Sequence, residues 1–549
     1  MLGASDGAGV GTMALPAILR SAGNILRRGL CAGKVADPAG PDGEGERKLS
    51  KRQGEGGRGK GATAARGAGG RKAAARGAGE RKGADRGATA PVAGVDSPCP
   101  VDAVCGGCAH VAVPYEDQLA RKDETMRALF AQLRGAPEPL PILGMDDPFH
   151  YRDKVTSPFA PGAKIAGRGA NGAKGARSAK GSGRVAKADA RRRGLDREVL
   201  TGMYRVGTHE LVPTDRCLVE NEQGKRVVMA IRSMMGRFGV PPYNEDTGSG
   251  FMRHVVVRVG HESGEVLVTL VTNAREFPSS KQFCRELVKR CPFVTTVVQN
   301  VNTRQTNVIL GTEEHTLYGP GFILDTLCGL SFRISSQSFY QVNCTQTEVL
   351  YNVAVGFALG EGAGETGEFG VAGPGLTVID AFCGTGTIGL VAARRGAGRV
   401  IGVESVGKAV ADARQNARHN GIENASFATA DAGDFMLALA GTPPDQASQR
   451  AAGDALGDEP LDPARTVLMM DPPRAGSSED FLRAACALAP FRIVYISCNP
   501  ETQVRDLRYL LSHGYRLDRV QPVDMFPHTD HVETVCLLSK PSEVKPASM

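Results

Sequence analysis

The sequence predicts an α/β protein whose C-terminal part is a Rossmann-like, doubly wound and mostly parallel sheet. From about residue 375, apolar runs typical of buried strands alternate with helical patterns of about 10–15 residues, which is the signature of such a sheet. Between residues 98 and 345, strand-like runs dominate, which predicts a β-rich α+β region. Before residue 95, Gly, Ala, Arg and Lys prevail over large apolar residues, so this tail cannot bury enough surface to fold.

We therefore expect three parts: a disordered basic tail over 1–95, a central region over 96–345, and a C-terminal domain over 346–549. The chain carries a formal net charge of +7, but the tail alone holds 17 Lys and Arg against 8 Asp and Glu. A second basic stretch, 162–194, has the composition of a long loop insertion. Flexible basic segments on an otherwise acidic protein suit tethers for a polyanion.

The central region contains the patterns of two helices and several strands. The expected helices cover 115–133 and 279–290, and the expected strands cover 155–160, 200–207, 254–260, 265–273, 295–302 and 307–311.

The C-terminal part alternates strands with helices. The expected strands cover 376–382, 399–405, 466–473 and 492–500, and the expected helices cover 386–396, 407–421 and 478–489. Residues 441–464 have the composition of another loop insertion.

The first C-terminal strand ends at Asp380 and leads through a glycine-rich turn, which contains Gly384, into a helix. Glycines let the backbone approach a ligand, and a helix N-terminus favours a carboxylate or phosphate. Glu404 ends the next apolar run, where an acid can bind ribose hydroxyls. This spacing indicates a nucleotide-type cofactor and leaves NAD and S-adenosylmethionine open. The motif DxFCGTGxxGL and the tetrapeptide DPPR at 471–474 favour S-adenosylmethionine.

Cys498 follows another apolar run, so we expect it at the same crevice as Asp471, because parallel strands end at one edge of a sheet. By itself, a cysteine here is as well explained as a small core residue. A thiolate that adds to C6 of a pyrimidine, however, makes C5 nucleophilic enough to take a methyl group, and a base must then remove the C5 proton. Glu533, in the segment HVETVCLL, is a candidate for that base. The order DPPR, SCNP and HVE therefore favours a nucleophile.

The motifs DxFCGTG, DPPR, SCNP and HVE, with RISSQSFYQVN at 333–343, resemble the RNA 5-methyluridine methyltransferase family over roughly residues 98–540. Its members use S-adenosylmethionine to methylate uridines of 23S ribosomal RNA or transfer RNA. The resemblance implies that Cys498 is the nucleophile, that Glu533 is the proton acceptor, and that Phe339 lies near the target base. The residues that it implies around the cofactor are Gln341, Phe382, Glu404, Asp471 and, near the adenine, Asp431.

Four cysteines form a second pattern. Cys99, Cys105 and Cys108 have the spacing C-x5-C-x2-C, and Cys217 follows far downstream. Thiolates at such spacings ligate zinc or an iron–sulfur cluster, and spacing alone leaves a structural zinc site open. The ribosomal branch of the resembled family carries a 4Fe–4S cluster on this pattern, with the last cysteine in a context that reads GMYRVGTHELVPTDRC here. The resemblance thus implies a 4Fe–4S cluster and 23S ribosomal RNA as substrate.

Two alternatives stay open: a transfer-RNA uridine-C5-methyltransferase, whose branch generally lacks the four cysteines, and a non-catalytic, metal-containing RNA-binding or ribosome-assembly factor.

The thirteen cysteines, without a convincing secretory signal, indicate a reducing, cytoplasmic compartment. The apolar stretch near the N-terminus is too short for a membrane span, and a transit peptide is its alternative interpretation. We expect a monomer that binds 23S ribosomal RNA and no membrane.

Overall fold

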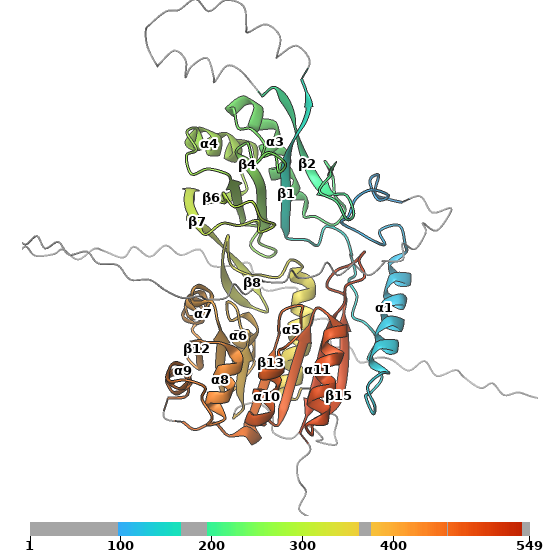
Figure 1. Ribbon diagram of the computed structural model, residues 1–549, viewed down its shortest axis with the longest axis vertical. Coiled ribbons are helices and arrows are strands. Elements are labelled where there is room, and N and C mark those ends of the chain that lie inside the picture. The colour runs from blue at the N-terminus through green and yellow to red at the C-terminus, as the bar shows by residue number, and fades with distance from the viewer. Residues whose placement is uncertain (1–96, 166–194, 362–374, 458, 541–549) are drawn as a thin grey trace, which may run out of the picture. The chain divides into compact units, whose positions relative to one another are not determined.

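The computed structural model describes residues 97–165, 195–361, 375–457 and 459–540 (Figure 1). The chain divides into two compact units, 1–88 and 89–549, and all described residues belong to the second. The expected disordered tail lies outside the described residues. So does the expected insertion over 162–194, apart from residues 162–165, of which the first three complete a strand.

The central region contains four helices and nine strands among the described residues. In chain order they are α1 (Tyr115–Phe130), β1 (Lys154–Lys164), β2 (Arg197–Tyr204), β3 (Leu211–Pro213), α3 (Glu222–Phe238), β4 (Met252–Val259), β5 (Val266–Thr272), α4 (Ser280–Arg290), β6 (Val294–Val301), β7 (Glu313–Tyr318), β8 (Phe322–Leu327), β9 (Leu330–Ser335) and α5 (Cys344–Leu359).

Seven of these strands form one sheet in the order β3-β2-β1-β4-β5-β6-β7, and β8 and β9 form a separate antiparallel hairpin. The pairs in the sheet are antiparallel except β5 with β6, which are parallel and connected through α4. Every residue of β4 and β5 is buried, as expected for central strands rich in Val and Leu. Apolar side chains of α3 and α4 pack with those of β4 and β5 in one hydrophobic core.

The C-terminal part alternates strands and helices. Its elements are β10 (Thr377–Ala381), α6 (Thr387–Arg394), β11 (Arg399–Glu404), α7 (Gly407–His419), β12 (Ala425–Thr429), α8 (Ala432–Leu439), α9 (Gln446–Leu456), the 3₁₀ turn η1 (Pro463–Arg465), β13 (Thr466–Met470), α10 (Glu479–Leu488), β14 (Arg492–Ser497), α11 (Pro500–Ser512), β15 (Arg516–Val523) and β16 (Glu533–Ser539).

These strands form a second seven-stranded sheet in the order β12-β11-β10-β13-β14-β16-β15. The first five strands are parallel, and β16 is antiparallel to both of its neighbours. The prediction of a doubly wound, mostly parallel sheet is therefore confirmed. The strand order reverses between β10 and β13, and in such sheets the crevice at the carboxyl ends of these strands is where ligands bind.

Helices cover both faces of the C-terminal sheet, as Figure 1 shows. Side chains that alternate along each strand belong to two separate cores: Val378 faces α5, α6 and α7, whereas Ile379 faces the core that includes α8, α10 and α11. Strands buried on both sides explain why the sequence shows continuous apolar runs here.

Two sequence predictions were wrong. Residues 307–311 are not a strand, because the side chain of Asn302 donates hydrogen bonds to the carbonyl oxygens of Val308 and Ile309 and holds the segment as a loop. Residues 441–464 are not only a loop, because they contain helix α9. The Asp445 side chain accepts the backbone N–H of Ser448 and caps that helix.

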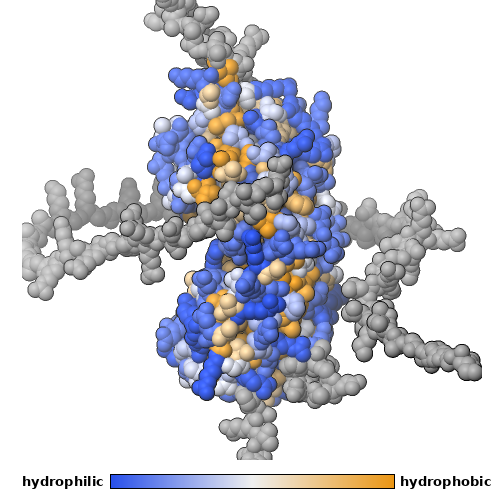
Figure 2. Space-filling model, turned by 90° about the vertical axis from the view of Figure 1, so that its right-hand side faces the viewer, coloured by the Kyte–Doolittle hydropathy of each residue, from blue (hydrophilic) through white to orange (hydrophobic). Residues whose placement is uncertain are grey.

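Figure 2 shows a face on which hydrophilic residues predominate and hydrophobic residues lie between them in groups. The large apolar side chains that the described part of the chain exposes are Leu140, Val206, Val308, Tyr318, Phe339 and Val406. No helix in the described ranges is long and apolar enough to cross a membrane.

Candidate active site

Cys498 and Glu533 lie at the same edge of the C-terminal sheet. Cys498 directly follows β14, Glu533 begins β16, and these strands pair antiparallel with Ser497 opposite Thr534. The next position along this register sets Cys498 opposite Glu533. Cys498 is half-buried and Glu533 is buried.

Burial and negative charge shape the proton affinity of this pair. Burial, followed by the charges of Glu533 and Asp471, raises the pKa of Cys498 to about 11, and the positive charge of Arg474 opposes this shift. Burial and then Asp471 raise the pKa of Glu533 to about 8. Perturbed groups gathered in one crevice are typical of functional sites.

The DPPR segment follows β13. Asp471 is its first residue, and burial raises the pKa of this carboxyl to about 7. The carbonyl oxygen of Arg474 accepts hydrogen bonds from the side chains of Asn499 at 3.2 Å and Thr502 at 3.3 Å. The Arg474 guanidinium lies 3.3 Å from Nδ1 of His531. Arg474 thus connects the segments that carry the thiol and the carboxyl, a role that the sequence analysis did not assign.

The glycine-rich turn between β10 and α6 has a backbone suited to a ligand. Phe382 has a φ of +65° and Gly384 a φ of +54°, and the Phe382 ring packs on Phe481 with ring centroids 5.0 Å apart. The buried Asp380 carboxylate accepts the backbone N–H of Gly389 at 2.9 Å, in the first turn of α6.

Glu404 ends β11, and its carboxylate accepts backbone N–H groups of both Gly384 (3.2 Å) and Val406 (2.8 Å). Burial raises the pKa of Asp380 to about 7, and the charges of Asp471 and Glu404 add to the shift. The acids at the strand ends, Asp380, Glu404 and Asp471, therefore form one electrostatically coupled group with Cys498 and Glu533. We call these three residues the strand-end acids.

The remaining predicted residues lie around this group in different ways. Asp431 is the N-cap of α8 and accepts the backbone N–H groups of Gly433 and Asp434. Phe339 is 71% exposed, and Gln341 is half-buried in the segment between β9 and α5. No hydrogen bond joins these last two side chains to the strand-end acids within the described ranges.

The segment that carries Phe339 is held by the central sheet. The buried Arg258 guanidinium, from β4, donates to the carbonyl oxygens of Ser338 at 2.6 Å and Tyr340 at 3.4 Å. Arg258 is another residue that the sequence analysis missed, because an arginine in a Val-rich strand carries no motif.

The loop before Glu533 is fixed from outside the sheet. His528 has a φ of +66°, and its carbonyl oxygen accepts the backbone N–H groups of Ala109 (2.9 Å) and His110 (3.1 Å). The backbone N–H of His528 donates to the side-chain oxygen of Gln118, whose amide nitrogen lies 3.1 Å from His528 Nδ1. The imidazole Nε2 lies 3.1 Å from the carbonyl oxygen of Pro148, and burial lowers the pKa of His528.

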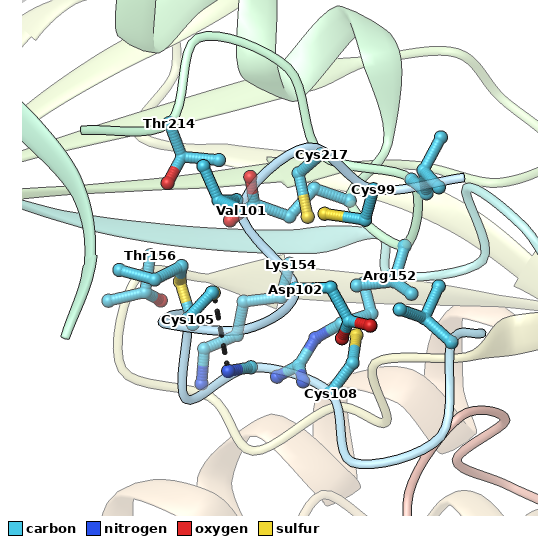
Figure 3. Close-up of a pocket in the computed structure, with 16 residues that line it drawn as sticks. Cys99, Val101, Asp102, Cys105, Cys108, Arg152, Lys154, Thr156, Thr214 and Cys217 are labelled. Carbon is cyan, nitrogen blue, oxygen red and sulfur yellow. Dashed lines mark hydrogen bonds between the residues drawn. The ribbon is translucent and has the colours of Figure 1, made fainter. Parts of the chain in front are cut away.

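The four predicted cysteine ligands line one cavity of about 150 Å³ (Figure 3). Figure 3 shows the sulfur atoms of Cys99 and Cys217 pointing toward one another. The Cys105 sulfur accepts the backbone N–H of Gly107 at 3.4 Å. Burial, followed by the charges of Cys217, Cys105 and Cys99, raises the pKa of Cys108 to about 12.

Sulfur donors around one cavity fit the chemistry of zinc or an iron–sulfur cluster. In the part of the chain that the structure describes, however, no three His, Cys, Asp or Glu side chains lie close enough together to hold a metal ion. The cavity is also lined by the cationic residues Arg152 and Lys154, which would offset the negative charge of thiolates.

Known proteins resemble this chain over most of its length. Residues 372–541 match the family described as tRNA (Uracil-5-)-methyltransferase. An uncharacterized RNA methyltransferase from Halalkalibacterium halodurans is 35% identical over 446 residues, which cover 81% of this chain and 83% of the relative. One from Listeria monocytogenes is 36% identical over 450 residues, with 81% and 84% covered.

Among solved structures, the tRNA (uracil-54, C5)-methyltransferase of Pyrococcus abyssi, in complex with S-adenosyl-L-homocysteine, is similar in fold. Its TM-score is 0.56 at 22% identity, with 79% of this chain and 86% of that chain covered. This likeness agrees with the doubly wound sheet. The chain belongs to the S-adenosylmethionine-dependent RNA 5-methyluridine methyltransferase family.

Proposed function

We propose that this protein forms 5-methyluridine in 23S ribosomal RNA, with Cys498 as the nucleophile and Glu533 as the proton acceptor. The observation that supports this best is the register of β14 and β16, which sets a half-buried thiol opposite a buried carboxyl. The pair lies beside the carboxyl ends of β10 and β13, where the strand order reverses.

The proposed reaction begins when the Cys498 thiolate adds to C6 of uracil, so that an S–C6 bond forms and electron density moves to C5. C5 then forms a bond to the methyl carbon, the bond between that carbon and the donor sulfur breaks, and its electron pair stays on the sulfur. The Glu533 carboxylate takes the proton from C5, the C5–C6 double bond returns, and the S–C6 bond breaks to release the thiolate. Arg474 favours the thiolate form of Cys498, because its charge lowers the pKa of this thiol.

S-adenosylmethionine, when bound, supplies the methyl group on a positively charged sulfur. The residues proposed to hold it are Asp380, Phe382, Gly384, Glu404, Asp431, Asp471 and Gln341. The ribose hydroxyls and the α-ammonium group of this cofactor would find hydrogen-bond acceptors in the strand-end acids. The turn at Gly384 has space for close approach, since no atom lies within 4 Å of a Cβ added there.

The target uridine must leave a stack or already be single-stranded to bring C6 to Cys498. We propose that Phe339 contacts this base, because its aromatic ring is 71% exposed and base stacking on such rings is favourable.

We further propose that Cys99, Cys105, Cys108 and Cys217 hold a 4Fe–4S cluster with a structural role, with a structural zinc ion as the alternative. The shared cavity supports a common ligand. None of the proposed steps of methyl transfer requires electron transfer to or from a cluster. The four thiolates would therefore serve to hold their loops together.

The choice of RNA rests on the four cysteines, which favour the ribosomal branch. The second candidate is a transfer-RNA uridine-C5-methyltransferase, in a reducing, cytoplasmic setting like the first. It is favoured by the description of the matching family and by the activity printed for the Pyrococcus abyssi enzyme.

The test uses full-length protein, S-adenosylmethionine, and 23S ribosomal RNA and transfer RNA that lack 5-methyluridine, with mass-spectrometric mapping of the product. RNA that contains 5-fluorouridine should become covalently attached to the protein. With fluorine in place of the C5 hydrogen, a base has no proton to remove, so the S–C6 bond cannot break. Cys498→Ala should abolish the adduct, whereas Cys486→Ala, a half-buried cysteine on α10, should retain it. Trapping that survives Cys498→Ala would contradict the mechanism, and methylation of transfer RNA alone would contradict the substrate.

A further inference from the structure

A groove in the central region lies outside the candidate active site and outside the four-cysteine cavity. Its volume is about 500 Å³, and it is lined by Tyr204, Tyr243, Arg253, His254 and the loop of residues 305–309. The Arg253 guanidinium lies over the Tyr243 ring, 4.5 Å from its centroid. Tyr243 and Arg253 are buried, whereas Tyr204 is half-buried, so Tyr204 is the ring of this pair of tyrosines on which a nucleic-acid base could stack.

Two buried side chains of this groove each have one nitrogen without a hydrogen-bond partner in the described part of the chain. Arg253 is 4% exposed and His254 is 8% exposed, yet Arg253 Nε and His254 Nδ1 have no partner in the described part of the chain. An unpaired polar atom in a buried position is costly, by about 1–3 kcal/mol.

One wall of the groove is an exposed but well-held loop. Asn302 donates to the carbonyl oxygens of Val308 (2.7 Å) and Ile309 (2.9 Å), and Arg304 donates to that of Leu310 at 2.9 Å. Arg253 Nη1 in turn donates to the carbonyl oxygens of Asn302 and Arg304. The loop is thus ordered before any ligand binds, which lowers the entropy lost on binding.

The charges of the groove disfavour phosphate. Glu245 and Asp246 line it together with Arg253, so that two carboxylates and one guanidinium belong to its lining. Burial, and then the charge of Arg253, lowers the pKa of His254 to about 4, so this imidazole is neutral at physiological pH. Carboxylates accept hydrogen bonds from the amino groups of adenine, cytosine and guanine, whereas uracil has no amino group.

The groove is connected to the segment that carries Phe339. The carbonyl oxygen of Gly311, just after the groove loop, accepts the side-chain amide of Gln337 at 3.5 Å and that of Asn300 at 3.0 Å. Gln337 lies two residues before Phe339 in the chain. The groove loop and the segment that carries Phe339 are therefore joined through Gly311.

We propose that this groove binds one amino-bearing base of the RNA substrate, apart from the target uridine, by stacking on tyrosine and hydrogen bonding to the carboxylates. The inference rests on the RNA-directed function proposed above. It adds a second point of base recognition, which would help to select the RNA site.

The test measures binding of fluorescein-labelled RNA decamers A10, C10 and U10 to the full-length protein by fluorescence anisotropy. Salt at about 0.2 M weakens contacts with phosphates that do not depend on the base. A10 or C10 should bind more tightly than U10, and Tyr204→Leu should weaken the binding of A10 and C10 about tenfold, as expected for loss of one stacked base. Tyr318→Leu, an exposed tyrosine outside the groove, is the matched control.

Glu245→Gln is the second variant, because it keeps the size of an exposed side chain and is expected to leave the fold intact. It should reduce the preference for A10 and C10 over U10 about fivefold, whereas Glu262→Gln, also exposed, should not change it. Ultraviolet cross-linking followed by peptide mapping should place the RNA on peptides that contain Tyr204.

Equal affinities of the variants and wild type, together with no cross-link on these peptides, would overturn the proposal. The outcome can be separated from that of the proposed function, because binding in the groove does not need Cys498. If Cys498→Ala keeps the cross-links while wild type forms no 5-fluorouridine adduct, the groove stands and the proposed function fails. If the adduct forms but the cross-links are absent, the reverse holds.

Discussion

The carbonyl oxygen of His528 accepts the backbone N–H of Ala109 at 2.9 Å, across 419 positions of sequence. Ala109 directly follows Cys108, one of the four cysteines, and His528 lies five residues before Glu533. The contact connects the loop of the four-cysteine cavity to the loop that leads into the proposed proton acceptor. A ligand that orders the cysteines would therefore also order the approach to Glu533.

This connection predicts the effect of removing the metal that we propose for the four cysteines. After chelation, the backbone N–H groups of residues 105–110 should exchange with deuterium about tenfold faster, and so should those of residues 524–531, because the two segments share hydrogen bonds. Hydrogen–deuterium exchange with mass spectrometry measures both segments, and β4 serves as an internal control. Faster exchange at 105–110 with no change at 524–531 would contradict the coupling.

A buried ion pair fixes the same loop to α1. Lys122 Nζ lies 2.7 Å from Asp524 Oδ1, and both side chains are buried. Lys122→Met leaves the carboxylate without its cation and should lower the free energy of unfolding by about 3–5 kcal/mol. Urea denaturation measures it. Arg127→Ala, also on α1, removes an exposed ion pair with Glu138. It should lower the free energy of unfolding by no more than about 1 kcal/mol. Equal losses of unfolding free energy in the two variants would mean that burial of the ion pair does not decide its contribution to stability.

Two glycines in helices allow a matched comparison: Gly389 in α6, which follows the glycine-rich turn, and Gly453 in α9. A Cβ at Gly389 would lie 2.8 Å from Asp380 Oδ2, so Gly389→Ala should lower the free energy of unfolding by about 1–3 kcal/mol and weaken S-adenosyl-L-homocysteine binding. A Cβ at Gly453, in α9, meets nothing within 4 Å, so Gly453→Ala should stabilise by about 0.5–1 kcal/mol. Thermal unfolding and calorimetry measure the two effects, and stabilisation by both substitutions would contradict the crowding at Asp380.

The C-terminal fold could be predicted from sequence because its signals are local. Asp380, Glu404 and Cys498 each follow an apolar run, and a parallel sheet brings such positions to one edge. The proximity of Glu533 to Cys498 depends on the antiparallel insertion of β16 between β14 and β15, which periodicity does not reveal. It was inferred from the family's motifs and from the need for a base.

Contacts between distant segments could not be predicted. The hydrogen bonds of His528 with Ala109 and of Arg258 with Ser338 join residues whose own sequences contain no pairing signal. Helix α9 was missed because Pro and Gly flank a short alanine-rich stretch, and composition outweighed the capping residue Asp445. The Asn302 loop was missed because a side chain there replaces the hydrogen bonds of a strand.

The stability of the cofactor-free protein should depend on pH through Glu533. Its pKa is about 8 in the folded protein, above the ordinary value of 4.5, so folding favours the protonated carboxyl. The stability that this group contributes is therefore fully present below about pH 4.5 and is lost as pH rises to about 8. Glu533→Gln cannot ionise and should become progressively more stable than wild type across this interval. Urea denaturation at pH 5, 6.5 and 8 measures the difference, with the exposed Glu501→Gln as control. Because Asp380 and Asp471 are present in both proteins, their own pH dependence cancels to first order, and parallel profiles for wild type and Glu533→Gln would mean that Glu533 is ionised in the folded protein at neutral pH.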